Sequence, residues 1–251
     1  MKIVLTNDDG IHALGLCALH EALSQDHEVI VVAPDGERSA VGHAITLADP
    51  IKVRQIPFSR NGTGWAINGT PADCVKLALN CLVEGPPVDL VISGINVGAN
   101  VGINVLYSGT VSAATEAAIL GVKGIAISLD TLRDPQFCGA ALYAKEIAEW
   151  FVSSQQESFA INVNVPSIAF HRIRGVKVTK QATFSLQERF ERRTDPRGNT
   201  YYWQCLASVE HIPDQECDIA WLKKDYITVT PLRHDLTLME KIGDLSPPEP
   251  V

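Results

Sequence analysis

The N-terminal part of the chain alternates apolar and amphipathic stretches in the order strand, helix, strand. Residues 3–5 are an apolar run, and residues 15–25 carry leucine and alanine at helical spacing. A second apolar run follows at residues 27–34 and stops at a proline. This order predicts a βαβ unit, in which two parallel strands are joined by a right-handed helical crossover.

The same alternation continues through the centre of the chain. Apolar runs at residues 88–92 and 124–129 predict two more buried strands, and residues 111–120 and 135–152 predict helices. We therefore expect an α/β fold, a Rossmann-like three-layer sandwich built around a mostly parallel sheet.

Strands without intervening helices are expected elsewhere. Residues 51–67 predict a strand pair, and residues 159–166 alternate as in a strand with one apolar face. The charged stretch 187–199 predicts an exposed hairpin or arm. Short strands are expected at residues 176–179, 201–203 and 226–231.

One domain is expected over residues 1–251. It would comprise an α/β core at about 1–170 and a β-rich part at about 171–251, which includes the arm and a C-terminal segment. The last dozen residues are rich in proline and should be loosely held unless a partner chain covers them.

Composition excludes several classes of function. The 251 residues are 46% apolar and carry a net charge of −8, which argues against broad binding to nucleic acid or to an anionic membrane. No apolar stretch approaches the roughly 20 residues that span a bilayer. The six cysteines include no Cys-x-x-Cys pair, and the N-terminus lacks a secretory leader, so we expect a cytoplasmic protein with reduced thiols. Cys74 and Cys81 should pack in the core.

Two adjacent carboxylates, Asp8 and Asp9, follow the first predicted strand. Like charges side by side repel, and both stay ionised only if a cation, a helix N-terminus or hydrogen-bond donors face them. The pair therefore indicates a site for a hard metal ion. The alternative is a solvated turn closed by an Asx-type hydrogen bond.

Further polar residues follow other predicted strands. Ser39 lies in the loop at residues 34–46, and Asn96 lies in a stretch where glycine and asparagine recur. Ser108-Gly109-Thr110 opens a helix, where free N–H groups and the helix dipole favour a phosphate. Because parallel strands end at one edge of a sheet, we expect these residues to meet Asp8 and Asp9.

Two other features have structural and functional interpretations. His43 could be a metal ligand, a general acid or an ordinary loop histidine. Thr70, Pro71 and Asp73 form a capping-box-like helix start, and the backbone at Gly69-Thr70 could also line a ligand pocket.

Together these residues resemble the survival protein SurE family of metal-dependent nucleotidases. The motifs in question occur in family order over about residues 3–235: TNDDG at 6–10, RSA at 38–40, NGTPADCV at 68–75, SGINVGAN at 93–100, YSGTV at 107–111, NVNVP at 162–166, DPRG at 195–198 and ITVTPL at 227–232.

The resemblance implies a phosphomonoesterase that acts on nucleoside 5′- and 3′-monophosphates, with hydrolysis of short polyphosphate as a side activity of some members. It implies one divalent cation per subunit, Mn²⁺ or Mg²⁺, held by Asp8, Asp9, Ser39 and Asn96. Asp8, Asp9 and Asn96 would be catalytic. The substrate-binding residues would be Ser39, Ala40, Asn96, Ser108, Gly109 and Thr110. It also implies a homodimer or homotetramer in which C-terminal segments are exchanged.

Three positions depart from the family pattern. Leu14 stands where the family commonly has proline, Asn104 where it has aspartate, and Ser112 where it has glycine. Asn104 removes a carboxylate near the predicted site, and Ser112 would narrow the space behind the phosphate. All four predicted metal ligands are present.

Two nucleophiles could attack phosphorus during hydrolysis: a metal-activated water oriented by Asp8, or Asp8 itself. The chain lacks the Asp-x-Asp spacing of aspartyl-phosphate phosphatases, which favours water. A nucleotide-binding sensor with little turnover, or a protein that acts mainly through its assembly, are the alternative functions.

Overall fold

A single large sheet forms the framework of the structure. The structure is a computed structural model that describes residues 1–58, 62–154, 157–184, 189–205 and 212–245. Nine of the described strands form this sheet, in the order β3 (Val53–Phe58), β4 (Gly62–Ile67), β2 (Glu28–Pro34), β1 (Lys2–Thr6), β5 (Leu90–Val97), β6 (Lys123–Asp130), β7 (Ala160–Pro166), β11 (Ile227–Leu232) and β8 (Val176–Val178).

Most neighbouring strands in the sheet are parallel. The strands from β4 through β2, β1, β5 and β6 to β7 all run in one direction. Strands β3 and β11 pair antiparallel with β4 and β7, and β8 lies parallel to β11. The predicted mostly parallel sheet is confirmed, and the short C-terminal strands β8 and β11 extend it.

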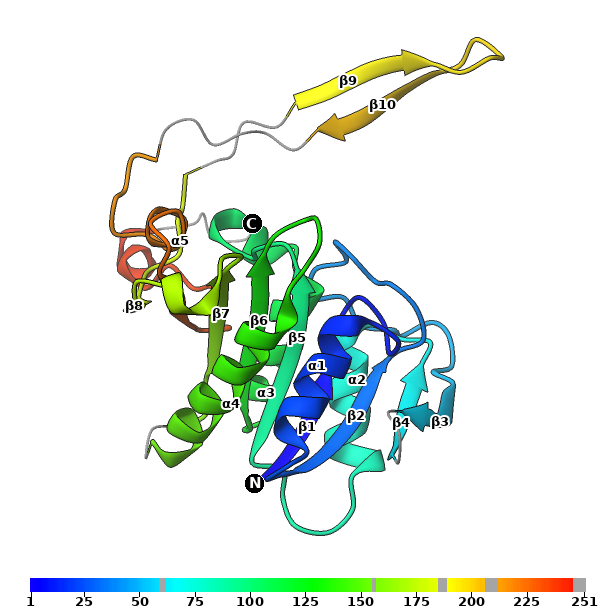
Figure 1. Cartoon of the computed structure of the whole chain (residues 1–251). Coiled ribbons are helices and arrows are strands. Elements are labelled where there is room, and N and C mark those ends of the chain that lie inside the picture. The colour runs from blue at the N-terminus through cyan, green and yellow to red at the C-terminus, as the bar shows by residue number, and fades with distance from the viewer. Residues whose placement is uncertain (59–61, 155–156, 185–188, 206–211, 246–251) are drawn as a thin grey trace.

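Helices cover both faces of the sheet (Figure 1). One layer contains α1 (Leu14–Leu23) and α4 (Phe137–Ser153), which pack together, and the other contains α2 (Pro71–Leu77) and α3 (Gly109–Ile119). The three-layer sandwich expected from the sequence is confirmed.

The sequence of strand β1 is continuously apolar because both faces of the strand are buried. Its side chains Ile3 and Leu5 belong to the core beneath α1 and α4, whereas Val4 belongs to the core beneath α2 and α3. A parallel strand between two helical layers is buried on both faces, so alternate residues have no polar environment to face.

Helix α2 begins with the predicted capping box. The Thr70 hydroxyl accepts a hydrogen bond from the Asp73 N–H, and the Asp73 carboxylate accepts one from the Thr70 N–H. The helix continues as a π-helical turn at Ala78–Leu82. Cys74 is buried as expected, but Cys81 is exposed, so its predicted core position is wrong. The change from α to π geometry alters which side chains face the sheet.

Strand β7 departs from the expected one-sided pattern. All seven residues are buried, including the polar Asn162 and Asn164. Both amide groups donate to the backbone carbonyl of Asn100, at 2.7 and 3.1 Å. The alternating polar residues therefore face a loop of the same chain rather than solvent.

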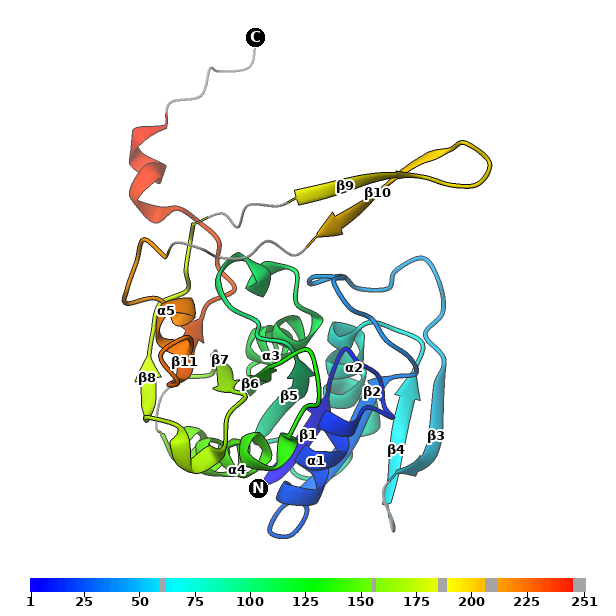
Figure 2. The same cartoon turned by 45° about the horizontal axis from the view of Figure 1, so that its top comes forward.

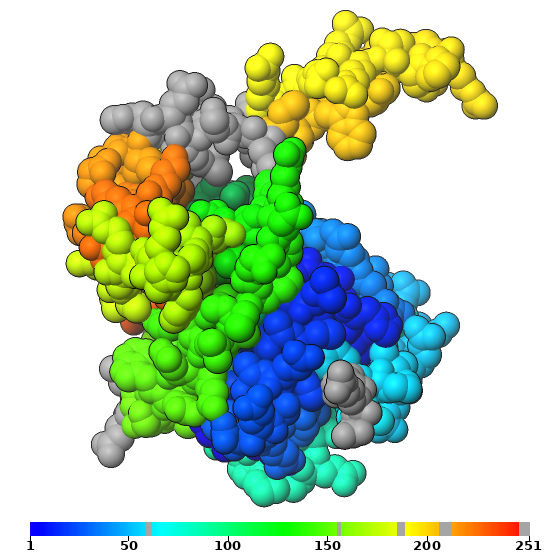
Figure 3. All heavy atoms as spheres, in the orientation of Figure 1, coloured from blue at the N-terminus to red at the C-terminus, as the bar shows by residue number. Residues whose placement is uncertain are grey.

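A two-stranded hairpin projects from the body of the molecule. Strands β9 (Arg189–Thr194) and β10 (Thr200–Cys205) pair antiparallel, and every residue of β9 is exposed. Figures 1 and 2 show the hairpin lying away from the main sheet, and the space-filling view in Figure 3 shows it as a separate projection. The exposed arm predicted from the charged stretch is confirmed over the described residues, with residues 201–203 as part of its second strand.

The remaining expectations concern the ends of the chain and membranes. The last residues, 246–251, lie outside the described residues, so their predicted looseness stays a prediction. Over the part of the chain that the structure describes, no helix has the length and apolar character needed to cross a membrane.

Candidate active site at the carboxyl edge of the sheet

Three neighbouring strands bring the predicted metal ligands to one edge of the sheet. Asp8 and Asp9 follow β1, Ser39 lies in the loop after β2, and Asn96 lies near the end of β5. Strand β1 pairs in parallel with both β2 and β5, and the register places Thr6 opposite Ser93. Parallel pairing of adjacent strands is what gathers loops that are far apart in sequence.

Asp8 lies in close contact with the start of helix α3. Its side chain is buried, and its Oδ1 accepts a hydrogen bond of 2.5 Å from the Thr110 hydroxyl. A Cβ at Gly109 would lie 2.8 Å from the Asp8 Cβ. Only glycine permits this approach, so the helix N-terminus predicted to hold phosphate lies directly against the first carboxylate.

The two carboxylates are unfavourably placed for ionisation without a counter-charge. Burial raises the pKa of Asp8 despite its hydrogen bonds from Thr110. Burial, followed by the charges of Asp8 and Glu37, raises the pKa of Asp9 to about 6. Among the described residues, neither carboxylate forms an ion pair with a basic side chain. A divalent cation would offset the repulsion, so the pair fits a metal ion.

The other two predicted ligands supply neutral oxygens. The Asn96 amide nitrogen donates to the Gly98 carbonyl at 2.8 Å, which leaves its carbonyl oxygen for coordination. The exposed Ser39 hydroxyl donates to Glu37 at 2.7 Å. Over the described residues, no group of three or more His, Cys, Asp or Glu side chains could hold a metal ion. The candidate set therefore depends on these oxygens as well as the two carboxylates.

Glu37 was not identified from the sequence. It hydrogen-bonds Ser39 and lies close enough to Asp8 and Asp9 to raise the pKa of both. The neighbouring Ala40 has a positive φ of 55°, a strained value for a residue with a Cβ. The loop after β2 thus presents an extra carboxylate and a constrained backbone beside the Asp pair.

The N-terminus of α3 has the geometry expected of an anion site. Ser108 is the N-cap, and its hydroxyl accepts from the Val111 N–H at 3.1 Å. The Thr110 hydroxyl donates its hydrogen bond to Asp8, so Thr110 orients this carboxylate in addition to its predicted contact with phosphate. The Ser112 hydroxyl donates to the Ser108 carbonyl at 2.6 Å. Ser112 stands where the family pattern has glycine, and its hydroxyl finds its hydrogen-bond acceptor within the first turn of α3.

The glycine- and asparagine-rich loop after β5 is held by hydrogen bonds to three elements. The Asn100 N–H donates to the Asn164 side chain of β7 at 2.8 Å, and the Asn100 amide nitrogen donates to the Ser128 hydroxyl of β6 at 2.9 Å. The Gly102 N–H donates at 2.8 Å to Asp218, which belongs to helix α5 (Asp218–Leu222). These partners were not predicted, because each lies far away in sequence. The only local signal was an Asn-x-Asn pair within an apolar strand.

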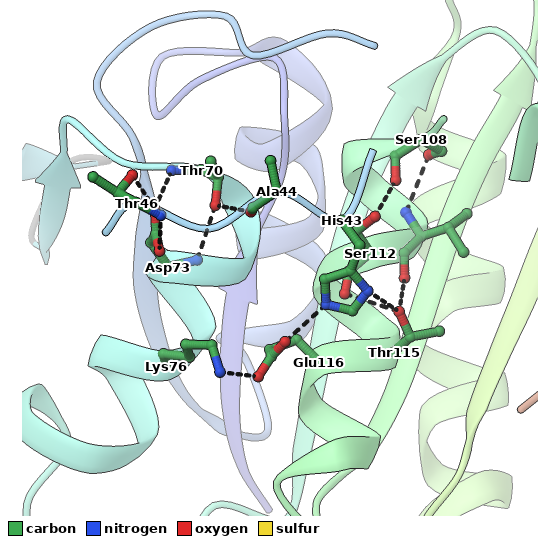
Figure 4. A network of polar contacts seen from close by, with 11 residues as sticks. His43, Ala44, Thr46, Thr70, Asp73, Lys76, Ser108, Ser112, Thr115 and Glu116 are labelled. Carbon is green, nitrogen blue, oxygen red and sulfur yellow. Dashed lines mark hydrogen bonds and ion pairs between the residues drawn. The ribbon is translucent and has the colours of Figure 1, made fainter. Parts of the chain in front are cut away.

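His43 lies in a polar network on the side of α3 that faces α2 (Figure 4). Its Nε2 lies 2.7 Å from Glu116, and its Nδ1 lies 3.4 Å from the Thr115 hydroxyl. Lys76 of α2 forms an ion pair with the same Glu116 at 2.6 Å. Glu116 was missed from the sequence, although a lone carboxylate in a helix of small residues was a visible signal.

Comparisons with known proteins agree with this arrangement. The family model for the survival protein SurE matches residues 3–188. A protein named 5′-nucleotidase SurE from Syntrophobacter fumaroxidans is 48% identical over 98% of both chains. One of the same name from Syntrophus aciditrophicus is 50% identical over 98% of this chain and 92% of that one. The crystal structure of a SurE protein from Aquifex aeolicus is similar with a TM-score of 0.86, at 36% identity and over 98% of both chains.

Proposed function

Because the chain belongs to the SurE survival-protein family, we propose that it is a nucleotidase that hydrolyses nucleoside 5′-monophosphates to nucleoside and phosphate. The observation that carries the proposal is the contact between Thr110 and Asp8. This contact sets an anion-binding helix N-terminus against a pair of carboxylates that have no basic partner among the described residues. Such a site offers a phosphate monoester two kinds of partner, the N–H groups of a helix N-terminus and carboxylates that can hold a metal ion.

Each proposed residue has a role that follows from its chemistry. Asp8, Asp9, Ser39 and Asn96 would hold one divalent cation, Mn²⁺ or Mg²⁺, which supplies charge stabilisation for the phosphoryl oxygens. Ser108, Gly109 and Thr110 would orient the phosphate at the positive end of the α3 dipole. Ser39, Ala40 and Asn96 would contact the substrate from the facing loops.

Asp8 would either orient the attacking water or attack phosphorus itself. Its burial and its hydrogen bond from Thr110 restrict the carboxylate to one orientation, which suits a group that positions water. The stereochemical course at a chiral phosphorus separates the two routes, because each displacement inverts the configuration. A single attack by water gives net inversion, whereas an aspartyl-phosphate formed on Asp8 and then hydrolysed gives net retention.

The test of the function is a panel of 5′- and 3′-nucleoside monophosphates and short polyphosphates, assayed with Mn²⁺, Mg²⁺ and a chelator. We expect phosphate release from 5′-monophosphates that depends on a divalent ion. Activity on 3′-monophosphates and polyphosphate stays a prediction from the family resemblance. Nucleotide binding without turnover under any divalent ion would instead favour the nucleotide sensor.

Self-association is also proposed, as a homodimer or homotetramer. The support is the projecting β9–β10 hairpin, which exposes Phe190, Tyr202 and Trp203. An isolated two-stranded hairpin is marginally stable in water, so packing against a second copy would stabilise it. The single-domain organisation over residues 1–251 and the cytoplasmic location stay predictions.

A further inference from the structure

A buried carboxylate joins three segments on the side of α3 that faces α2 (Figure 4). The Glu116 side chain is only 4% exposed, and each of its oxygens has a basic partner: Lys76 Nζ of α2 lies 2.6 Å from Oε1, and His43 Nε2 lies 2.7 Å from Oε2. His43 belongs to the loop between β2 and β3. Glu116 therefore links that loop to both helices of one layer.

The same loop carries the proposed metal ligand Ser39. On one side of Ser39, the Arg38 N–H donates to the Asp8 carbonyl at 2.7 Å. On the other side, the first contacts with another element are the Gly42 N–H to the Tyr107 carbonyl at 3.0 Å and the His43 ring to Glu116. Between these anchors, Ser39 itself bonds only Glu37 among the described residues, two positions away in the chain. The position of Ser39 thus depends on anchors that flank it.

The His43 anchor differs from the others in strength. Gly42 contributes a single neutral backbone hydrogen bond, whereas His43 bonds a carboxylate that is shielded from water, and hydrogen bonds to ionised groups are the stronger kind. Further along, the Thr70 hydroxyl donates to the Ala44 carbonyl at 2.8 Å and Thr46 bonds Asp73. Those contacts secure the later part of the loop, so His43 is the side-chain anchor nearest to Ser39 on that side.

We propose that His43 is a positioning residue for Ser39: through Glu116, it holds the loop after β2 against the helix that carries Ser108–Thr110, and thereby sets the affinity of the metal site. The inference rests on the proposed function, because Ser39 has this role only if it is a metal ligand. His43 itself neither coordinates the ion nor touches the substrate.

The second basic partner of Glu116 indicates that the variant His43→Ala should still fold. Replacing His43 by Ala leaves Lys76 as a cation for Glu116, so no unpaired buried charge is created and the fold should persist. Lys145→Met is a matched control, because it removes an ion pair with Asp26 in the opposite helical layer. It should lower stability slightly without affecting the loop.

The experiment measures Mn²⁺ binding to the full-length protein by titration calorimetry, with free Mn²⁺ followed by electron paramagnetic resonance. Removing a group that orients a metal ligand typically weakens binding about 10–100-fold. We expect His43→Ala and Glu116→Gln to weaken Mn²⁺ binding by about tenfold or more, and Lys145→Met to leave it unchanged. Nucleotidase kcat at saturating Mn²⁺ should stay close to that of the wild type, because the cradle is intact.

A double variant tests whether His43 acts through Ser39. Ser39→Ala alone should weaken Mn²⁺ binding, and adding His43→Ala should produce no further loss. Equal losses from His43→Ala with and without Ser39 present would overturn the proposal, as would unchanged affinity in His43→Ala alone.

Failure of this inference is distinguishable from failure of the proposed function. If the wild-type protein binds no Mn²⁺ and releases no phosphate, the metal site and the nucleotidase assignment are both wrong. If the wild type binds Mn²⁺ and is active while His43→Ala and Glu116→Gln match it in affinity, only the positioning role is wrong.

Discussion

At the scale of single residues, the candidate site is defined by carboxylates whose environment disfavours their charge. Asp8 is buried against the start of α3, and Asp9 is next to it in a partly buried turn. The Asn7 side chain closes this turn by bonding the Gly10 backbone through both of its polar groups. The Asx-type turn considered as an alternative is therefore present at Asn7, and it holds the Asp pair in place.

Asp8→Asn should abolish nucleotidase turnover, with a decrease of at least about a thousandfold, comparable to loss of a principal catalytic group. The amide is nearly isosteric and can still accept from Thr110, so the fold should be retained. Steady-state rates with saturating Mn²⁺ and thermal unfolding check both parts. A rate within a few-fold of the wild type would show that Asp8 is not in the site.

The contribution of Asp9 to the stability of the metal-free protein should fall as pH rises from about 4 to about 6. The pKa of Asp9 is raised from 3.8 to about 6, so in this window the native state holds a proton that the unfolded chain has released. Asp9→Asn removes this contribution, and its free energy of unfolding should depend less on pH. Thermal melts in chelator across this range, compared between the two proteins, provide the measurement; parallel profiles would contradict the assigned shift.

At the scale of elements, close backbone contacts set the position of α3 and hence of the anion cradle. A Cβ at Gly124 of β6 would lie 2.0 Å from the Ala114 carbonyl oxygen of α3. The helix therefore lies against the strand at a distance that only glycine allows. Together with the approach of Gly109 to Asp8 at the N-terminus of the helix, this contact sets the position of α3.

Gly124→Ala should destabilise the protein by about 3 kcal/mol or more, because the added methyl group meets backbone rather than a side chain that can rotate. Gly243→Ala is the matched control, since a Cβ there would have no neighbour within 4 Å. Urea unfolding measures both. Equal stability of Gly124→Ala and wild type would mean that α3 can shift outward freely, and the tight packing described above would be wrong.

At the scale of the whole molecule, the hairpin is an element that pairs with no other strand among the described residues. Tyr201, Tyr202 and Trp203 of β10 are all exposed, although aromatic side chains usually bury much of their surface. The hairpin adds no strand to the main sheet, whose described edge strands are β3 and β8. The hairpin is thus the natural candidate for contacts between copies.

Replacing Tyr202 and Trp203 together by Ser should lower self-association while leaving the α/β body folded. Light scattering coupled to size-exclusion chromatography, over a range of protein concentrations, reports the mass of the assembly. Arg197→Ser, in the turn of the same hairpin, is a control that removes no aromatic surface. An unchanged mass for the aromatic variant would assign the contact between copies to another surface.

The sequence by itself determined the order of strands and helices, the capping box at Thr70 and Asp73, and the proposal that Asp8 and Asp9 share an edge with Asn96 and Ser108. These follow from hydrophobic periodicity, turn chemistry and the rule that parallel strands end on one side, all of which are local or topological.

Only the tertiary structure decided the contacts between distant segments. The amides of β7 on Asn100, the hydroxyl of Thr110 on Asp8 and the double engagement of Glu116 join residues separated by 40 to 102 positions in the chain. Such pairings depend on how the layers close on each other, and neither side chain of a pair carries a local signal of its partner. They determine which polar groups stay available to a ligand and which hold the site together.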